Sequence, residues 1–203
     1  AEDLTRKVFA EVIDTTLPEA FPRLTWAEAM DRFGSDKPDL RFELELKDVA
    51  EAALASEYKI FQGVLADGGQ VKGVNAKGCS QFPRSQVDSL IAFAQEQGAK
   101  GLSWIKHTDN GLESSIVKFF PEASQRLLIE ALNSAPGDLL LLVADQPAMV
   151  ARVLGALRLE LAKRLDLCAD NDWKPLWVTQ FPPLEFDVDE DRYLAMHHPF
   201  PAP

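Results

Sequence analysis

Hydrophobic residues near the start of the chain recur at the spacing of a helix. A first helix, ending before Pro18, is predicted by the positions of Leu4, Val8 and Val12. The stretch LTWAEAMDRFG predicts a second helix, because Thr25 and Glu28 have the spacing of a capping box and Gly34 supplies a left-handed stop. A turn-rich stretch, GSDKPDLRF, follows this second helix.

The middle of the chain contains two predicted hairpins. Their strands are expected at residues 58–66 with 69–78, and at residues 101–108 with 112–120. Turn signals separate the strands of each pair, at Asp67-Gly68-Gly69 and at Asp109-Asn110-Gly111. Between the hairpins, a helix closed by Gly98 is predicted by the spacing of Val87, Leu90, Ile91 and Ala94.

Three further elements complete the middle of the chain. Pro121 opens a helix, the run DLLLLVA is a buried strand, and Pro147 starts a long helix. The order is therefore hairpin, helix, hairpin, helix, strand, helix. This order predicts an α/β (α+β) fold, a two-layer sandwich with a mainly antiparallel sheet and helices on one face.

The last part of the chain predicts an acidic hairpin. Residues 175–186 form one expected strand, residues 187–192 an acidic turn, and residues 193–200 the returning strand. Because neighbouring side chains of a strand point to opposite faces, only one of His197 and His198 can face a given pocket. If Leu194 and Met196 pack into the core, His197 faces the open side.

The charge of the chain is distributed unevenly. The net charge is −11, and a protein of this sign does not hold a polyphosphate unaided. Residues 1–47 carry 7 basic and 11 acidic groups, residues 48–165 carry 12 and 13, and residues 166–203 carry 2 and 8. The middle segment is therefore close to neutral and behaves as a separate unit.

Composition restricts the class of protein. Hydrophobic residues make up 46% of the 203 residues, enough for a packed core. The longest apolar run, residues 139–144, is far shorter than the ~18 residues that a membrane span needs, so no membrane partner is expected. Cys79 and Cys168 stand alone, which favours a reduced, cytoplasmic protein over a disulfide scaffold.

The residues alone leave the candidate chemistry open. His197 and His198 form either a pair of surface histidines on a tail or one wall of a pocket. The stretch GSDKPDLR is ordinarily a solvated turn, and residues 187–191 have no calcium-loop spacing. No Gly-rich phosphate loop or HExxH motif is present in the sequence. From these patterns the chain is a soluble α/β protein of unassigned chemistry.

Two long segments resemble consecutive catalytic-domain segments of bacterial aspartyl-tRNA synthetase. They are FPRLTWAEAMDRFGSDKPDLRF (residues 21–42) and PLWVTQFPPLEFDVDEDRYLAMHHPFPAP (residues 175–203). In that family the two segments flank an inserted domain known as GAD, which also occurs in a subunit of the tRNA-dependent amidotransferase. The stretches GAKGLSWIKHTDNGLESSIVKFF and GALRLELAKRL are similar to that insert.

The resemblance implies a division of the chain into three parts. Residues 1–47 are expected to be a catalytic-domain segment before the insert, residues 48–165 the GAD insert, and residues 166–203 a catalytic-domain segment after it. The chain begins without Met, and we expect it to be a fragment of a longer parent.

The resemblance also implies an activity for the parent. The parent activates L-aspartate with ATP and Mg²⁺ and transfers it to tRNA, and we expect a cytoplasmic homodimer. The substrate-contacting histidine of the family lies in the His-His-Pro motif, which assigns aspartate binding to His197, with His198 second. Ser35, Asp36 and Lys37 are placed near the same pocket. An imidazole beside the substrate carboxylate can donate a hydrogen bond, and the negative charge favours its protonated form.

The ATP-binding signatures of the family are not in this sequence. Neither the Phe-Arg-Asp/Glu of the second motif nor the Gly-x-Gly-x-Gly-x-Glu-Arg of the third is present. We therefore expect no catalytic residue, metal site or bound cofactor in this fragment, and no activity from it alone. The alternative is a non-catalytic GAD-type module that binds RNA or protein. The two flanking signatures favour the ligase, since an independent module has no reason to carry them.

Overall fold

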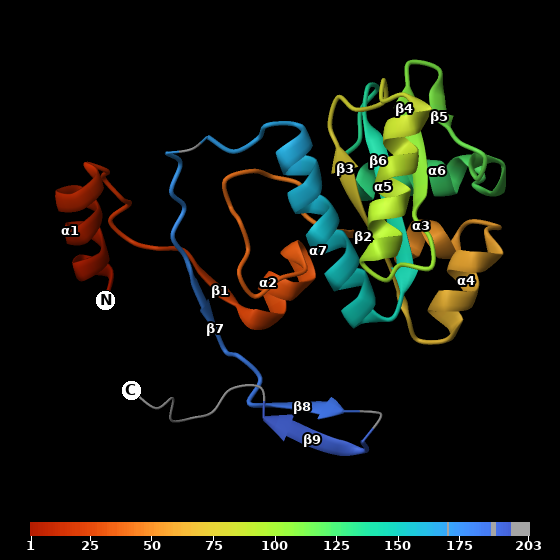
Figure 1. Ribbon diagram of the computed structural model, residues 1–203. Coiled ribbons are helices and arrows are strands. Elements are labelled where there is room, and N and C mark those ends of the chain that lie inside the picture. Colours follow the sequence, from red (N-terminus) through yellow and green to blue (C-terminus); the bar gives the residue numbers. More distant parts are fainter. Residues whose placement is uncertain (170, 188–189, 196–203) are drawn as a thin grey trace.

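A five-stranded antiparallel sheet organises the centre of the molecule (Figure 1). This computed structural model describes residues 1–169, 171–187 and 190–195. The strand order of the sheet is β2-β3-β6-β4-β5, and each neighbouring pair is antiparallel. The strands are β2 (Lys47–Asp48), β3 (Gln70–Ala76), β4 (Ser103–Thr108), β5 (Gly111–Glu113) and β6 (Leu139–Asp145).

The central strand β6 explains why helices cover both faces of this sheet. Its residues alternate between the two faces, and each face carries its own buried cluster. Leu139, Leu141 and Val143 belong to one cluster, whereas Leu140 and Leu142 belong to the other. An unbroken apolar run in a strand requires apolar cover on both sides.

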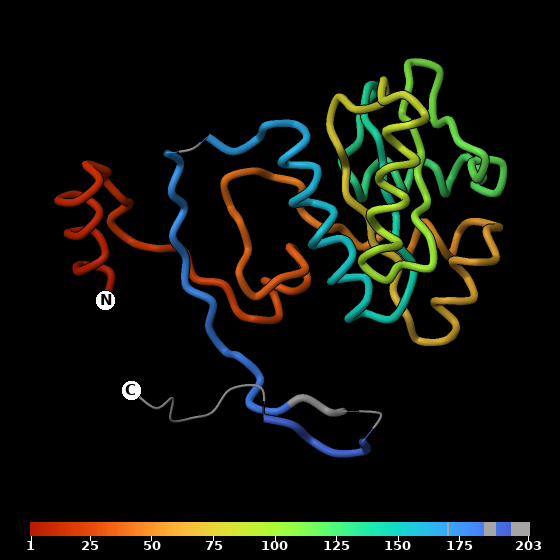
Figure 2. Tube along the Cα trace, in the orientation of Figure 1, coloured from red at the N-terminus to blue at the C-terminus, as the bar shows by residue number. Residues whose placement is uncertain are grey.

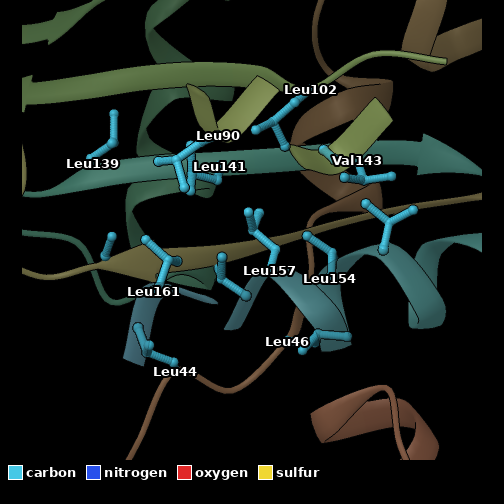
Figure 3. Close-up of a cluster of buried hydrophobic side chains, with 14 of the residues drawn as sticks. Leu44, Leu46, Leu90, Leu102, Leu139, Leu141, Val143, Leu154, Leu157 and Leu161 are labelled. Atoms are coloured by element: carbon cyan, nitrogen blue, oxygen red, sulfur yellow. The ribbon is translucent and has the colours of Figure 1, made fainter. Parts of the chain in front are cut away.

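Two helices, α5 (Arg84–Glu96) and α7 (Pro147–Arg164), cover the first face. Figure 3 shows leucines of β6 and α7 meeting in this cluster, with Leu44 and Leu46 joining it on the side of α7. The second face is covered by α3 (Ala50–Leu54), α4 (Lys59–Ala66), the 3₁₀ helix η1 (Val117–Phe119) and α6 (Glu122–Ala131). Aromatic rings gather on this face, where Tyr58 contacts Phe61 edge-on and stacks on Phe119.

The mixed α/β class and the antiparallel sheet are confirmed, but the two-layer prediction with helices on one face is wrong. The unit has three layers, because helices pack on both faces of the sheet (Figure 1). The run of apolar residues in β6 was the available signal, since a strand with one solvated face alternates apolar and polar residues.

The prediction of a strand at residues 58–66 is also wrong. This segment contains helix α4, in which Phe61 is buried and Leu65, one turn later, packs against the same cluster. The spacing of these two residues is that of one helical face. Gly68, at φ +76°, then ends the helix and does not form a hairpin.

The second predicted hairpin is confirmed only in its first part. Strands β4 and β5 pair across the expected turn, with Thr108 opposite Gly111. The strand expected at residues 112–120 ends at Glu113, and η1 follows. The helices predicted around Val87, after Pro121 and after Pro147 are all present, as α5, α6 and α7.

The flanking segments pair with each other beside the central unit. They contribute helix α1 (Glu2–Ile13), strand β1 (Arg23–Thr25), helix α2 (Trp26–Phe33) and strand β7 (Trp177–Thr179). Strands β1 and β7 are parallel, and Leu24 lies opposite Val178. The predicted capping box at the start of α2 is confirmed, since the Glu28 backbone N–H donates to the Thr25 hydroxyl and the Thr25 backbone N–H donates to the Glu28 carboxylate.

The last described elements form a short hairpin. Strand β8 (Leu184–Asp187) pairs antiparallel with β9 (Arg192–Ala195). The single strand expected at residues 175–186 is interrupted between β7 and β8, where Gln180 has φ +56° and prolines follow. His197 and His198 lie outside the described residues. Within the described part of the chain, every helix is too short or too polar to cross a membrane.

Candidate functional site

The three candidate residues after α2 form one tight turn. Helix α2 ends at Gly34, which has φ +67°, and Ser35, Asp36 and Lys37 follow it directly. The backbone N–H of Lys37 donates to the Ser35 hydroxyl over 3.1 Å. Ser35 and Asp36 are half-buried and Lys37 is exposed, so the turn presents its polar side chains at the surface.

Helix α7 holds the start of this turn by direct contact between main chains. Gly34 lies against Gly155 of α7, and a Cβ added to Gly155 would come within 2.7 Å of the Gly34 carbonyl oxygen. A Cβ added to Gly34 would meet the Ala151 carbonyl and the Gly155 Cα. Both positions therefore need glycine, and their contact fixes the end of α2 on the middle of α7.

One turn of helix further on, Arg158 enters the core beneath the same loop. It is only 1% exposed, and its guanidinium lies 4.2 Å from the centre of the Phe42 ring and 5.0 Å from that of Phe33. The guanidinium donates to the backbone carbonyl oxygens of Asp39 (2.8 Å), Glu43 (3.0 Å), Leu44 (3.2 Å) and Phe42 (3.4 Å). Burial lowers the pKa of Arg158 to about 10.

Leu44, one of the residues held by Arg158, has an unusual backbone conformation. Its φ is +52°, in the left-handed region that a branched, buried side chain rarely adopts. The Leu44 side chain is buried in the core cluster shared with α7, and its carbonyl accepts from Arg158 Nε. A conformation of this kind persists only where its surroundings hold it.

Ion pairs hold the outer side of the loop. Arg32 donates to both carboxylate oxygens of Glu45, over 2.6 Å and 3.2 Å, and this hydrogen bonding lowers the pKa of Glu45 to about 2. Asp39 accepts from the Arg41 guanidinium over 2.7 Å, which lowers the pKa of Asp39. Residues 39–46 are therefore held by Arg158 of α7 and by Arg32 of α2, and Figure 2 shows this loop running beside α7.

A cavity of about 360 Å³ separates this loop from the segment after α7. It is lined by Phe9 of α1, by residues 38–41 and by residues 172–175. The Phe9 ring meets the Trp173 ring edge-on, with 5.0 Å between their centres. The cavity therefore lies between the two segments that flank the central unit in sequence.

Glu2 connects these flanks a second time, at the paired strands. Trp177 Nε1 donates to Glu2 Oε1 over 2.7 Å, and Arg23 forms an ion pair with the same oxygen at 3.5 Å. Arg23 also lies over the Trp177 ring, 6.0 Å from its centre. Three side chains therefore meet here, one each from α1, β1 and β7.

Ser35, Asp36 and Lys37 are consecutive in the chain and form the turn after α2. The other two candidates, His197 and His198, lie outside the described residues. Among the described residues no group of three or more His, Cys, Asp or Glu side chains could hold a metal ion. Sequence reasoning missed Arg158, although a single arginine inside the apolar pattern VLGALRLEL was a signal that could have identified it.

Comparisons with known proteins identify the central unit and the chain around it. The GAD domain family matches residues 61–154, so the unit built on the five-stranded sheet contains a GAD domain. The chain is 49% identical over 200 residues to the aspartate–tRNA(Asp/Asn) ligase of Halothermothrix orenii, covering 98% of this chain. It is 48% identical over 203 residues to the aspartate–tRNA(Asp/Asn) ligase of Bacillus mycoides, covering the whole chain.

The match extends through both flanks and the central unit. The aspartate–tRNA(Asp/Asn) ligase of Symbiobacterium thermophilum is 47% identical, again over the whole chain. By sequence, the chain is similar over its whole length to part of the bacterial aspartate–tRNA(Asp/Asn) ligases, and residues 61–154 match the GAD domain family. It spans 34% of the length of each of these three relatives.

Proposed function

We propose that this chain is the part of an aspartate–tRNA ligase that contains the insert and one wall of the aspartate pocket. The observation that carries the proposal is the identity of 47–49% over the flanks and the GAD domain together. In the proposed division, residues 1–47 and 166–203 belong to the catalytic domain and residues 48–165 to the insert. The longer protein activates L-aspartate with ATP and transfers it to tRNA, as a cytoplasmic homodimer.

Within this function, His197 donates a hydrogen bond to the side-chain carboxylate of aspartate, and His198 is the second candidate. The Ser35–Lys37 turn lies at the edge of the same pocket. A charged donor there favours aspartate over asparagine. The two side chains have nearly the same shape, but the neutral amide of asparagine attracts a positive charge less strongly than the carboxylate of aspartate. These residues bind and orient the substrate, and the acyl-transfer step itself is assigned to none of them.

ATP and Mg²⁺ serve the longer protein, and the ATP-binding signature motifs of the family are not in this sequence. In the described part of the chain no acidic cluster could hold a metal ion. ATP and Mg²⁺ would supply the activated phosphate chemistry when bound, and this chain's contribution is to bind the amino acid. We therefore expect no aspartate-dependent pyrophosphate exchange from the 203-residue chain alone.

The test is steady-state kinetics of pyrophosphate exchange with the longer protein. His197→Ala should raise the KM for aspartate more than the KM for ATP. The expected loss of binding free energy for aspartate is ~1.5–3 kcal/mol, the range for a hydrogen bond to a charged group. His198→Ala is the matched control and should mainly lower stability. An unchanged KM for aspartate in His197→Ala ends its assignment, and the reverse pattern transfers the role to His198.

The non-catalytic alternative has its own outcome in this experiment. If the wild-type longer protein shows no aspartate-dependent exchange but the chain binds RNA or another protein, the GAD-type binding module replaces the ligase. The flanking signatures support the ligase, because both continue the match to the relatives beyond the GAD domain.

A further inference from the structure

We propose that helix α7 of the insert positions the Ser35–Lys37 turn for aspartate binding, and that Arg158 is the positioning residue. The inference rests on the proposed function for its catalytic consequence. The insert is then more than an appended domain, because its longest helix supports one wall of the pocket. Figure 1 shows α7 lying between the five-stranded sheet and α2, from whose end the turn emerges.

The first argument is the number of contacts that converge on one short loop. Gly155 meets Gly34 at the residue before the turn, and Arg158 donates to four carbonyl oxygens of residues 39–44 just after it. The turn is therefore held at both of its ends by residues one helical turn apart on α7. Its own internal hydrogen bond, from Lys37 N–H to Ser35 Oγ, fixes only its tip.

The second argument is the chemistry of Arg158. Among the described residues, no carboxylate lies within ion-pair distance of its guanidinium, so backbone carbonyls take the place of a counter-ion. A buried cation without a paired anion is costly, and an apolar side chain would fill this core position at lower cost. Only a planar guanidinium presents several donors in a fixed arrangement to several carbonyls. Arginine at this position therefore fixes the geometry of the loop at a cost to the stability of the core.

The third argument is the strained residue that Arg158 holds. Leu44 has φ +52° and its carbonyl accepts from Arg158 Nε. Without this hydrogen bond, the left-handed conformation of Leu44 loses one of its supports, and the loop is free to relax toward an extended form. A relaxation at residues 39–44 moves the turn that precedes them.

The first experiment measures amide hydrogen exchange in the 203-residue chain and needs no activity. Arg158→Met keeps the length of the side chain but removes the donors. We expect amides of residues 35–46 to exchange about tenfold faster, with β6 little changed, because the opening is local. Arg152→Met is the matched control, since Arg152 is exposed on the same helix and should leave both regions as in wild type.

A second variant keeps the test decisive if Arg158→Met does not fold. Arg158→Lys keeps the charge and the apolar stem but loses the planar set of donors, and should give an intermediate increase at residues 35–46. Exchange equal to wild type at residues 35–46 in a folded Arg158→Lys or Arg158→Met overturns the inference. An equal increase in β6 and in residues 35–46 also overturns it, because the role is then structural.

The second experiment uses the longer protein and separates positioning from folding. Arg158→Lys should lower kcat/KM for aspartate about tenfold, mainly through KM, while the KM for ATP stays close to wild type. A purely structural role instead lowers the fraction of active enzyme, and with it kcat, at unchanged KM for aspartate. That outcome overturns the inference. If the wild-type longer protein shows no aspartate-dependent pyrophosphate exchange, the proposed function fails. Amide hydrogen exchange in the 203-residue chain then still decides whether Arg158 holds the loop.

Discussion

The central unit and the flanking helix α1 have equally clear hydrophobic patterns, yet only the central unit buries the apolar side chains of its pattern. Residues 139–143 of β6 are at most 1% exposed. In α1 the predicted apolar face stays open, with Leu4 68% and Val12 73% exposed. Helix α1 contacts the other flank through Phe9 and Glu2, at Trp173 and Trp177 respectively.

The difference shows what a periodic pattern specifies. Periodicity determines which element forms and which of its faces is apolar, whereas burial depends on whether a second apolar surface lies within reach. The central unit supplies such surfaces within the chain, since β6 is covered by α5 and α7 on one face and by α3, α4 and α6 on the other. Stability should therefore be concentrated in the central unit, and substitutions can test this.

The largest expected effect is the loss of a core leucine. Leu141→Ala removes a fully buried side chain from the central strand and leaves a cavity between β6 and α7, so it should lower the free energy of unfolding by about 3 kcal/mol. The matched control is Leu4→Ala, the same change on the open face of α1, with an expected effect below about 0.5 kcal/mol. Urea unfolding measures both. Similar losses at the two sites would contradict the contrast between the regions.

The second effect tests the contact that joins the two regions. Gly155→Ala places a Cβ within 2.7 Å of the Gly34 carbonyl oxygen and should lower the free energy of unfolding by about 2 kcal/mol. Gly63→Ala is the matched control, because it lies within α4 with nothing within 4 Å of the added Cβ. It should raise stability by about 0.5–1 kcal/mol through helix propensity. A stabilising Gly155→Ala would show that α2 does not rest on α7 as described.

The fold was predictable wherever local chemistry decides. The capping box at Thr25 and Glu28 and the helix after Pro147 follow from signals within a few residues, and both are present. The prediction failed at residues 58–66, where a short apolar run fits a strand or a helix equally well. It also failed for the layers: the unbroken apolar run of β6 indicated cover on both faces, but the pattern of each helix does not state which face of the sheet that helix covers.

The candidate site was predictable only in part. The turn at Ser35–Lys37 follows from Gly34, Pro38 and the polar residues between them. Its support by Arg158 joins positions more than a hundred residues apart, and no local pattern specifies such a contact. Arg158 within the stretch VLGALRLEL was visible in the sequence, but its acceptors are backbone carbonyls, which no side-chain type indicates.

Acid should weaken the outer support of the loop. Because the pKa of Glu45 is lowered from 4.5 to about 2, its pair with Arg32 stabilises the folded chain above pH 4.5, and this contribution disappears as the pH falls toward 2. Arg32 is partly exposed, so solvent screening limits the expected loss to about 1 kcal/mol. Urea unfolding measured across this range should show a smaller acid loss for Glu45→Gln than for wild type. Parallel curves for the two proteins would show that the Glu45–Arg32 pair does not contribute to the acid dependence of stability.

The smallest expected effect concerns the cap of α2, where a flank is stabilised by local hydrogen bonds and by one helix contact. Thr25→Ala removes the hydroxyl that accepts from the Glu28 backbone N–H, and should lower the free energy of unfolding by about 0.5–1 kcal/mol. Because α2 packs on α7, the loss should register in global unfolding, with faster amide exchange confined to the first turn of α2. Thr16→Ala, at an exposed position between α1 and β1, should change stability by less than about 0.3 kcal/mol. Both variants could instead unfold like wild type while amide exchange in α2 still rises in Thr25→Ala. In that case α2 frays independently of the core, and the boundary between the two regions lies at α7.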